Sequence, residues 1–218
     1  MAMSKKYSQT QIVISTTNPG KIAELRAVLG EIVGWLSLAD FPDVTPVEET
    51  GQTFADNARI KALGYANQTG LWAIADDSGL VIDALDGAPG IKSARFSGDK
   101  LPGEKAGLID HRNIAKVLQL MQNVPPGKRS ARFVCCLCLA APGKILLEAE
   151  GTLQGLIIER EIGENGFGYD PIFFVPELNK TVAQLTADEK NAISHRGQAI
   201  RRLKPKLLEM LSNAKIKK

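Results

Sequence analysis

Hydrophobic residues recur along the chain with two different periods. Three short apolar runs are typical of strands, and they lie at 11–16, 35–38 and 71–75; the first is rich in β-branched residues. After the first run, Ile22, Leu25 and Leu29 are spaced at i, i+3 and i+7, which predicts one face of an amphipathic helix. Further helices are expected to begin near Thr53, to cover 104–122, and to follow Thr186 and Ser194.

The second half of the chain predicts antiparallel pairing. The runs 129–141 and 144–158 are strand-like and meet at Pro142-Gly143, which is typical of a hairpin. Because helices alternate with strands early and a hairpin comes late, we expect an α/β fold in which helices flank a mixed sheet, in two lobes with a cleft between them. Pro205 lies inside the apolar pattern of the last helix and is expected to kink or break it.

The composition is that of a globular protein. Of 218 residues, 44% are hydrophobic and 23% are charged, which excludes disordered, collagen-like and coiled-coil chains. No apolar stretch reaches about 18 residues, and the first ten residues lack the apolar segment of a secretory signal. Cys135, Cys136 and Cys138 lie in an apolar run and are odd in number, so we expect buried thiols in a reducing compartment. We therefore expect a cytoplasmic protein that does not bind membranes.

The net charge of +3 is unevenly placed. Residues 201–218 contain seven Lys or Arg and one Glu, so residues 1–200 carry a net charge of −3. Cations at the end of a solvated helix suit its dipole. A surface for nucleic acid is also compatible with this basic segment, but interleaved aromatic residues are missing. We therefore expect nucleic acid not to be a partner.

A polar turn at 16–21 follows the first expected strand and opens a helix. Asn18 fits the N-cap position, and Pro19 fits the first helical position. Free backbone N–H groups and the dipole at such a helix start favour an anion, and Lys21 adds a positive charge. The spacing differs from that of a Walker A loop. A phosphate site and an ordinary capped helix both remain compatible with this segment.

Two acidic pairs offer candidate metal ligands. Asp76-Asp77, followed by Ser78-Gly79, comes at the expected carboxyl end of the strand at 71–75, where α/β folds bind ligands. Adjacent strand residues point to opposite faces, so only one carboxylate need reach a site. Carboxylate oxygens suit Mg²⁺, which takes few protein ligands. Glu48-Glu49 lies on the preceding Pro-rich loop. An Asx turn at Asp76-Asp77 and a solvated pair at Glu48-Glu49 are the alternatives without function.

Two later segments could recognise a ligand. Residues 163–171 place three glycines around two aromatic residues and a carboxylate, an arrangement suited to stacking on a base. Lys190 and the pair His195-Arg196 offer several hydrogen-bond donors near a break between helices. A glycine turn with buried aromatics and an ordinary helix cap are the structural alternatives. His111 aligns with the apolar Ile114 and is expected at the edge of the core.

These segments occur together and in one order, and that joint pattern is specific. The motifs are TTNPGK, EETGQTF, NARIKA, ADDSGL, GAPGIKSARFSG, GFGYDPIFF and LTADEKNAISHRGQA. Together they resemble the inosine triphosphate pyrophosphatase family, also called XTP/dITP diphosphatases, over roughly residues 11–208. The resemblance implies a 1–10 extension, a single two-lobed nucleotide pyrophosphatase domain over 11–208 with a long curved mixed sheet and a central cleft, and a basic tail over 209–218.

The resemblance also implies an activity. Members of this family hydrolyse nucleoside triphosphates with deaminated purines (ITP, dITP and XTP) to the monophosphate and pyrophosphate, and so cleanse the nucleotide pool. They need Mg²⁺ and are usually homodimers. We therefore expect a small-molecule nucleotide as substrate, Mg²⁺ as cofactor and a second copy of the chain as partner.

Site residues are carried over motif by motif from this resemblance. Glu49 and Asp77 are expected to ligate Mg²⁺, and Asp77 is expected to accept the proton of the attacking water. The triphosphate would be held by Thr16, Thr17, Asn18, Pro19, Gly20 and Lys21, with Lys61 reaching toward phosphate. Ser78 would contact substrate, and Arg95 would also face it. The loop on the side of the base would be Phe167, Gly168, Tyr169 and Asp170, and the contacts to the base edge would be Lys190, His195 and Arg196.

Two alternatives stay open at this point. One is a related pyrophosphatase for other modified nucleotides, which a nucleotide screen would separate. The other is a non-catalytic nucleotide- or RNA-binding module, which predicts no Mg²⁺-dependent turnover and a salt-sensitive affinity for RNA. The metal proposal further requires the carboxyl groups of Glu49 and Asp77 to lie close enough to share one ion, in the groove that houses Lys21.

Overall fold

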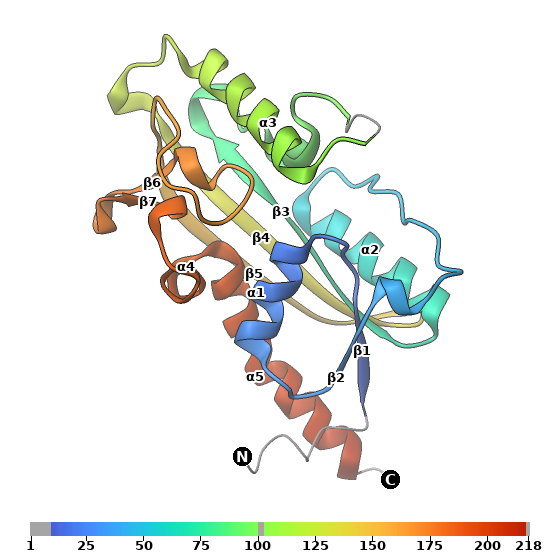
Figure 1. The fold of residues 1–218 in the computed structure, drawn as a ribbon. Helices are drawn as coiled ribbons and strands as arrows, with labels where there is room; N and C mark the ends of the chain where they lie inside the picture. Colours follow the sequence, from blue (N-terminus) through green and yellow to red (C-terminus); the bar gives the residue numbers. More distant parts are fainter. Residues whose placement is uncertain (1–9, 100–102, 217–218) are drawn as a thin grey trace. The chain divides into compact units, whose positions relative to one another are not determined.

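Seven strands form one mixed sheet in the computed structural model, which describes residues 10–99 and 103–216. The strands are β1 Gln11–Ile14, β2 Gly34–Ser37, β3 Trp72–Ile82, β4 Ser130–Ala141, β5 Lys144–Ile157, β6 Phe173–Val175 and β7 Lys180–Thr181. Their order is β2-β1-β3-β4-β5-β6-β7 (Figure 1). β1 is parallel to β2 and β3, whereas β6 is antiparallel to β5 and β7. The expected mixed sheet is therefore confirmed.

Five helices lie in the described residues, and three of them begin where capping residues predict. They are α1 Pro19–Leu29, α2 Phe54–Thr69, α3 Ala106–Met121, α4 Ala187–Ile193 and α5 His195–Ile216. Asn18 caps α1 with Pro19 at the first helical position, and Thr53 caps α2 by accepting from the Asp56 N–H. Thr186 and Glu189 form a reciprocal capping box at the start of α4. The predicted helix starts at these three sites are confirmed.

Two boundary predictions are wrong. The strand at 71–75 does not end at Asp76, because β3 continues through both aspartates and Gly79 to Ile82. Likewise, the expected break at Pro205 is wrong, because α5 runs through it, and the alternative of a kink stays a prediction. In both cases tertiary contacts outweigh a local preference: both Asp76 and Asp77 have cationic partners, and Leu203 and Leu207 on either side of Pro205 are fully buried.

The chain divides into two compact units. Unit 1 comprises Met1–Asp77, Cys135–Gly151 and His195–Lys218, and unit 2 comprises Ser78–Val134 and Thr152–Ser194. Strands β3, β4 and β5 each contribute residues to both units.

Unit 1 has its own apolar core. Ile12 and Ile14 of β1 pack there with Leu25 and Leu29 of α1 and with one face of β4. α5 packs against α1 and adds its inward leucines, including Leu203, Leu207 and Leu211. Residues 209–216, expected to belong to a basic tail, thus continue α5, and Leu211 is buried. Residues 1–9 of the expected N-terminal extension and residues 217–218 lie outside the described residues.

Unit 2 is built around a second core. Its buried residues come from the later part of β3, from α3, and from β4, β5 and β6, and they include Leu80, Val117, Phe133 and Phe173. The rings of Phe133 and Phe173 stack with centroids 4.3 Å apart. His111 is not part of this core: its ring is exposed and pairs with Glu161, so the expectation for His111 is wrong.

The three cysteines are buried on β4 as predicted. Burial raises the pKa of the Cys136 and Cys138 thiols to about 12 and that of Cys135 still further. Since the thiolate is the reactive form, these residues serve as small apolar side chains. Separately, none of the helices in the described part of the chain combines the length and apolar character needed to cross a membrane.

Candidate active site

The turn that starts α1 uses its own side chains to satisfy its backbone. The Oδ1 of Asn18 accepts hydrogen bonds from the N–H groups of Gly20 and Lys21 at 2.9 and 3.2 Å. The Oγ1 of Thr16 accepts from the Asn18 N–H at 3.2 Å. Two N–H groups expected to be free for an anion are therefore already paired, which corrects that part of the sequence analysis. Positive charge at this turn comes instead from the side chain of Lys21.

Asp76 lies between two cations. Its Oδ2 is 3.0 Å from Lys21 Nζ and 3.1 Å from Arg196 Nη2, and Arg196 also pairs with Glu24 of α1. The side chains of Asp76 and Arg196 are only 4% and 2% exposed. Burial alone would raise the pKa of Asp76, but Lys21 and Arg196 hold it well below its usual range. Asp76 is thus a fixed negative charge that joins α1, β3 and α5.

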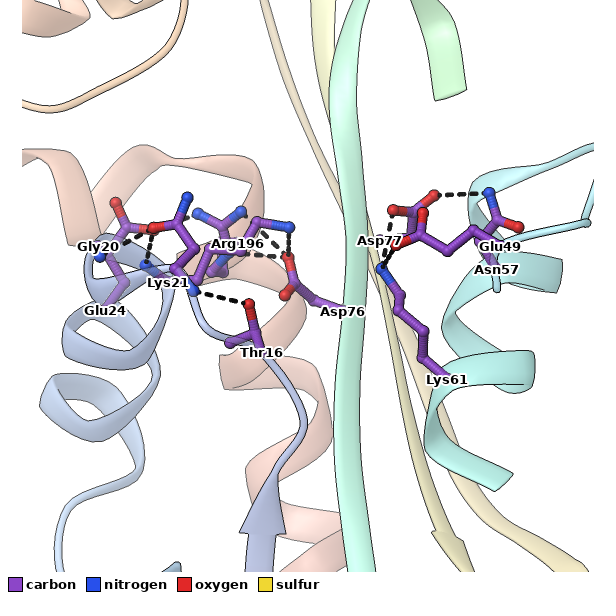
Figure 2. A network of polar contacts seen from close by, with 11 residues as sticks. Thr16, Gly20, Lys21, Glu24, Glu49, Asn57, Lys61, Asp76, Asp77 and Arg196 are labelled. Atoms are coloured by element: carbon purple, nitrogen blue, oxygen red, sulfur yellow. Dashed lines mark hydrogen bonds and ion pairs between the residues drawn. The ribbon is translucent and has the colours of Figure 1, made fainter. Parts of the chain in front are cut away.

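Asp77 faces a different set of partners. Its Oδ1 is 3.1 Å from Lys61 Nζ, and its Oδ2 accepts a hydrogen bond from Asn57 Nδ2 at 3.2 Å. Figure 2 shows the side chains of Asp76 and Asp77 on opposite sides of β3, with α1 and Arg196 near the first and α2 near the second. Burial raises the pKa of Asp77 despite the opposing effect of Lys61. A carboxylate with a raised pKa is a better proton acceptor than an ordinary one.

Lys61 joins two carboxylates. Its Nζ lies 3.1 Å from Asp77 Oδ1 and 3.1 Å from Glu49 Oε1. The two oxygens can therefore be no farther apart than the sum of these distances, and they already share one cation. Burial would lower the pKa of Lys61, but Asp77, Asp76 and Glu49 together raise it, so the ammonium stays charged.

Asn57 holds the loop that carries Glu49. Asn57 and Lys61 are one helical turn apart on the buried face of α2, so both reach β3. While its Nδ2 donates to Asp77, its Oδ1 accepts from the Gly51 N–H at 2.8 Å. A Cβ at Gly51 would lie 2.7 Å from that Oδ1 and 2.9 Å from the Asn57 nitrogen, so only glycine permits this approach.

The donor set fits a small divalent cation. Glu49 and Asp77 supply two carboxylates that converge on a cation, which meets the distance requirement stated above. In the described residues, no group of three or more His, Cys, Asp or Glu side chains is placed to hold a metal. Mg²⁺ is commonly held by one or two carboxylates, and substrate phosphates and water complete its coordination. The geometry therefore suits a metal that binds together with a phosphorylated ligand.

Unit 2 contains a second polar cluster, around Asp170. Its Oδ2 is 2.7 Å from Lys190 Nζ and accepts from the Phe167 N–H at 2.9 Å. Lys190 Nζ also lies 4.3 Å from the centroid of the Phe167 ring, within the range of a cation–π contact. Lys190 and Asp170 are almost fully buried, whereas Phe167 is partly exposed. The cluster presents an aromatic ring supported by a buried ion pair.

Comparison with known proteins decides the family. Residues 12–206 match the model of the Ham1 family. The chain belongs to the Ham1 family. Proteins named dITP/XTP pyrophosphatase from Bacillus cereus and Geobacter sulfurreducens are each 48% identical to it, over 93% and 91% of this chain and 97% and 96% of their own length. The resemblance drawn from the sequence motifs is confirmed.

Solved structures of Ham1 proteins have the same fold. A HAM1 protein from Coxiella burnetii superimposes with a TM-score of 0.82 at 41% identity, covering 92% of this chain and 100% of that one. The Ham1 protein of Staphylococcus aureus gives a TM-score of 0.80 at 39% identity, with the same coverage. The α/β fold expected from the sequence is therefore shared with Ham1 proteins.

The residues expected to form the site in this Ham1 protein fall in both units. Unit 1 carries Glu49, Lys61, Asp77, His195, Arg196 and the turn at 16–21, and unit 2 carries Ser78, Lys190 and the residues 167–170. Tyr169 is buried, and its hydroxyl donates to the Ser93 carbonyl at 2.8 Å. Arg95 is exposed on a short 3₁₀ helix of unit 2. His195 is the first residue of α5 and is buried.

Three residues of the polar network were not assigned from the sequence. They are Glu24, Asn57 and Asp76. Local spacing contained a signal for two of them, because Glu24 is one turn after Lys21 and Asn57 is one turn before Lys61. Asp76 was expected to point away from Asp77, but its partners on α1 and α5 are remote in sequence and could not be read from spacing.

Proposed function

We propose that this chain is a nucleoside triphosphate pyrophosphatase that converts ITP, dITP and XTP to the monophosphate and pyrophosphate. Relatives that are 48% identical over nearly their whole length carry the name dITP/XTP pyrophosphatase. The observation that best supports this activity is the convergence of Glu49 and Asp77 on one cation, Lys61 Nζ. Two carboxylates and a buried lysine are suited to a polyanionic substrate that brings a metal ion with it.

Glu49 and Asp77 would hold Mg²⁺ in this proposal. When bound, Mg²⁺ would neutralise phosphate charge and so favour attack by water. The raised pKa of Asp77 supports its role as the acceptor of the water proton. Water then breaks the bond between the α and β phosphates, and its oxygen remains on one product. The residue set requires no covalent enzyme intermediate, since the three thiols are buried and protonated.

Two lysines would bind the phosphates. Lys21 and Lys61 each carry an ammonium that lies against a carboxylate, at 3.0 and 3.1 Å. We propose that these cations bind the triphosphate and stabilise the departing pyrophosphate. The turn residues Thr16, Thr17 and Asn18 would position that tail, with the Asn18 cap keeping the start of α1 rigid.

Base selection is assigned to a second group of residues. Hypoxanthine and xanthine present a carbonyl acceptor at position 6, whereas adenine presents an amino donor. Donors from Lys190, His195 or Arg196 would therefore mismatch adenine, and such polar mismatches discriminate by about 10⁴-fold. Because Arg196 is paired with Asp76 and Glu24, we expect its contact with a base to depend on that ion network. Phe167 would stack on any purine and add affinity without selectivity.

A steady-state comparison of four nucleotides tests the proposal. Pyrophosphate release is measured from ITP, XTP, GTP and ATP, with Mg²⁺ and after its removal by chelation. We expect turnover of ITP and XTP only with Mg²⁺, and at least a hundredfold lower kcat/KM for ATP. Equal turnover of all four nucleotides would contradict the selectivity, and turnover in chelator would contradict the metal assignment.

We also propose that the protein forms a homodimer, as the sequence resemblance implies. Light scattering of the chain across a range of concentrations should give twice the monomer mass of 23.5 kDa. A monomer mass at all concentrations would contradict this assignment without affecting the proposed chemistry.

A further inference from the structure

The loop 163–170 of unit 2 is held from two neighbouring segments. On one side, the Asn165 N–H donates to the Ala183 carbonyl at 3.0 Å, and Asn165 Nδ2 donates to the Leu185 carbonyl at 3.0 Å. On the other side, the Gly168 N–H donates to Asp110 Oδ2 of α3 at 2.9 Å. Hydrogen bonds to two neighbouring segments therefore hold the loop in place.

The Asp110 contact lies next to the ring that we assign to the base. Successive N–H groups of the loop donate to two different carboxylates, that of Phe167 to Asp170 and that of Gly168 to Asp110. The first hydrogen bond holds the peptide plane before Phe167 and the second holds the plane after it, so together they fix the direction in which its side chain projects. Asp170 also pairs with Lys190, whose ammonium lies over the Phe167 ring.

The backbone of this loop leaves little freedom once those bonds form. Gly166 and Gly168 have φ values of +80° and +60°, which favour glycine. A Cβ at Gly166 would lie 2.0 Å from Asp170 Oδ2, so the chain passes directly over that carboxylate. The conformation is thus specific to these glycines and to the two acceptors.

Packing from α3 onto the loop is incomplete. A cavity of 350 Å³ is lined by both segments, including Asp110, His111, Glu164 and Phe167. His111 of α3 also pairs with Glu161, but its ring is 66% exposed, and exposed ion pairs contribute little stability. Beside this cavity, the hydrogen bond from the Gly168 N–H to Asp110 connects α3 directly to the loop.

We propose that Asp110 is a positioning residue that sets the Phe167 ring for stacking on the purine, an inference that rests on the proposed function. Asp110 acts through the backbone of Gly168 and does not itself touch the substrate. The feature that matters is a hydrogen-bond acceptor at this position, because the bond is made to a neutral N–H group. Burial raises the pKa of Asp110, which is consistent with a role that does not need the charge.

Three variants separate positioning from general stability. Asp110→Ala removes the acceptor, Asp110→Asn keeps an acceptor and removes the charge, and Gln119→Ala alters an exposed residue of the same helix. For each variant we would measure kcat and KM for ITP, the melting temperature, and amide hydrogen exchange in the 163–170 loop.

Asp110→Ala should raise KM for ITP by about three- to tenfold with little change in kcat, as expected for loss of one hydrogen bond. Exchange in the 163–170 loop should accelerate in the same variant. Asp110→Asn should restore most of both properties, and Gln119→Ala should match the wild type. The inference is overturned if Asp110→Ala leaves both KM and loop exchange unchanged, or if Asp110→Asn is as impaired as Asp110→Ala.

The test also separates this inference from the proposed function. If the wild type releases no pyrophosphate from any nucleotide, the proposed function fails, and the purine role of Asp110 fails with it. The exchange comparison still decides whether Asp110 holds the loop. If the wild type is active but Asp110→Ala leaves both KM and amide hydrogen exchange in the 163–170 loop unchanged, only the positioning inference fails.

Discussion

Asp76 and Asp77 are adjacent in β3, yet their carboxylates bind different cations. Asp76 pairs with Lys21 and Arg196, and Asp77 pairs with Lys61 (Figure 2). Because successive strand residues point to opposite faces, one dipeptide serves two polar networks. In the first network, Arg196 forms buried ion pairs with Asp76 and Glu24. The second network contains Glu49 and Asp77, the two carboxylates that we assign to a metal.

Replacing Asp77 should stop the reaction without unfolding the protein. Asp77→Asn keeps the size of the side chain but cannot accept the proton of water, so kcat should fall about 10³-fold or more. Isothermal titration should still detect ITP binding, and pyrophosphate release gives the rate. Glu48→Gln, at the exposed residue before Glu49, should keep wild-type activity. Near-normal turnover by Asp77→Asn would remove this residue from the mechanism.

Lys21 should distinguish triphosphates from monophosphates. Lys21→Ala removes a cation assigned to the phosphate tail, so the dissociation constant for ITP should rise about tenfold more than that for IMP. Both constants are measured by titration, with Lys144→Ala at the exposed first residue of β5 as the control. An equal loss of affinity for the two nucleotides would place Lys21 away from the β and γ phosphates.

Removing Arg196 from its ion pairs should strongly destabilise the folded protein. Arg196→Met removes the buried cation that Glu24 and Asp76 share and leaves Asp76 with Lys21, which should cost about 3–5 kcal/mol in urea unfolding. Adding Asp76→Asn to this variant should recover part of the loss, because one buried charge is removed. Arg26→Ala, at an exposed position of α1, should change stability by less than about 0.5 kcal/mol. Additive losses in the double variant would show that the two residues are uncoupled.

Gly151 should tolerate no side chain. A Cβ there would lie 2.1 Å from the His195 carbonyl oxygen and 2.6 Å from the Ala199 nitrogen, both backbone atoms of α5. Gly151→Ala should therefore destabilise the protein by about 2 kcal/mol or more. Gly107→Ala is the matched control, because its Cβ would enter open space in α3 and alanine favours helix. A wild-type melting temperature for Gly151→Ala would contradict this close approach.

The raised pKa of Asp110 predicts how stability varies with pH. A carboxyl whose pKa is higher in the folded state costs stability once it ionises, so stability falls as pH rises from the unfolded pKa of about 3.9 through the folded pKa. Asp110→Asn lacks this titration, so its melting temperature relative to wild type should increase over that interval. His111, Glu161 and Glu164 line the same cavity but are common to both proteins. A pH-independent difference would contradict the raised pKa.

Much of the fold could be predicted because its signals are local. The caps at Asn18, Thr53 and Thr186 satisfy backbone groups within three residues, and the hairpin turn at Pro142-Gly143 joins adjacent strands. Such features need no knowledge of the rest of the chain. The three cysteines were likewise placed correctly, because an apolar run around small residues indicates burial.

The failures come from partners that are distant in sequence. Two aspartates and a glycine disfavour a strand, but Lys21, Lys61 and Arg196 neutralise those aspartates inside β3, so the strand continues. The same reasoning applies to the α1 turn, where Asn18 already uses N–H groups that the motif left open. The site residues were assigned through the joint pattern of motifs, since spacing alone left a structural explanation for each, and their roles stay predictions.

The buried thiols of β4 have a practical consequence. Cys135, Cys136 and Cys138 are shielded and protonated at neutral pH, so the folded protein offers alkylating reagents little nucleophilic sulfur. A cysteine introduced on the surface would therefore react far faster than the native ones. Fluorophores or spin labels could be attached to chosen sites, such as the exposed end of a helix, without first removing the three natural cysteines.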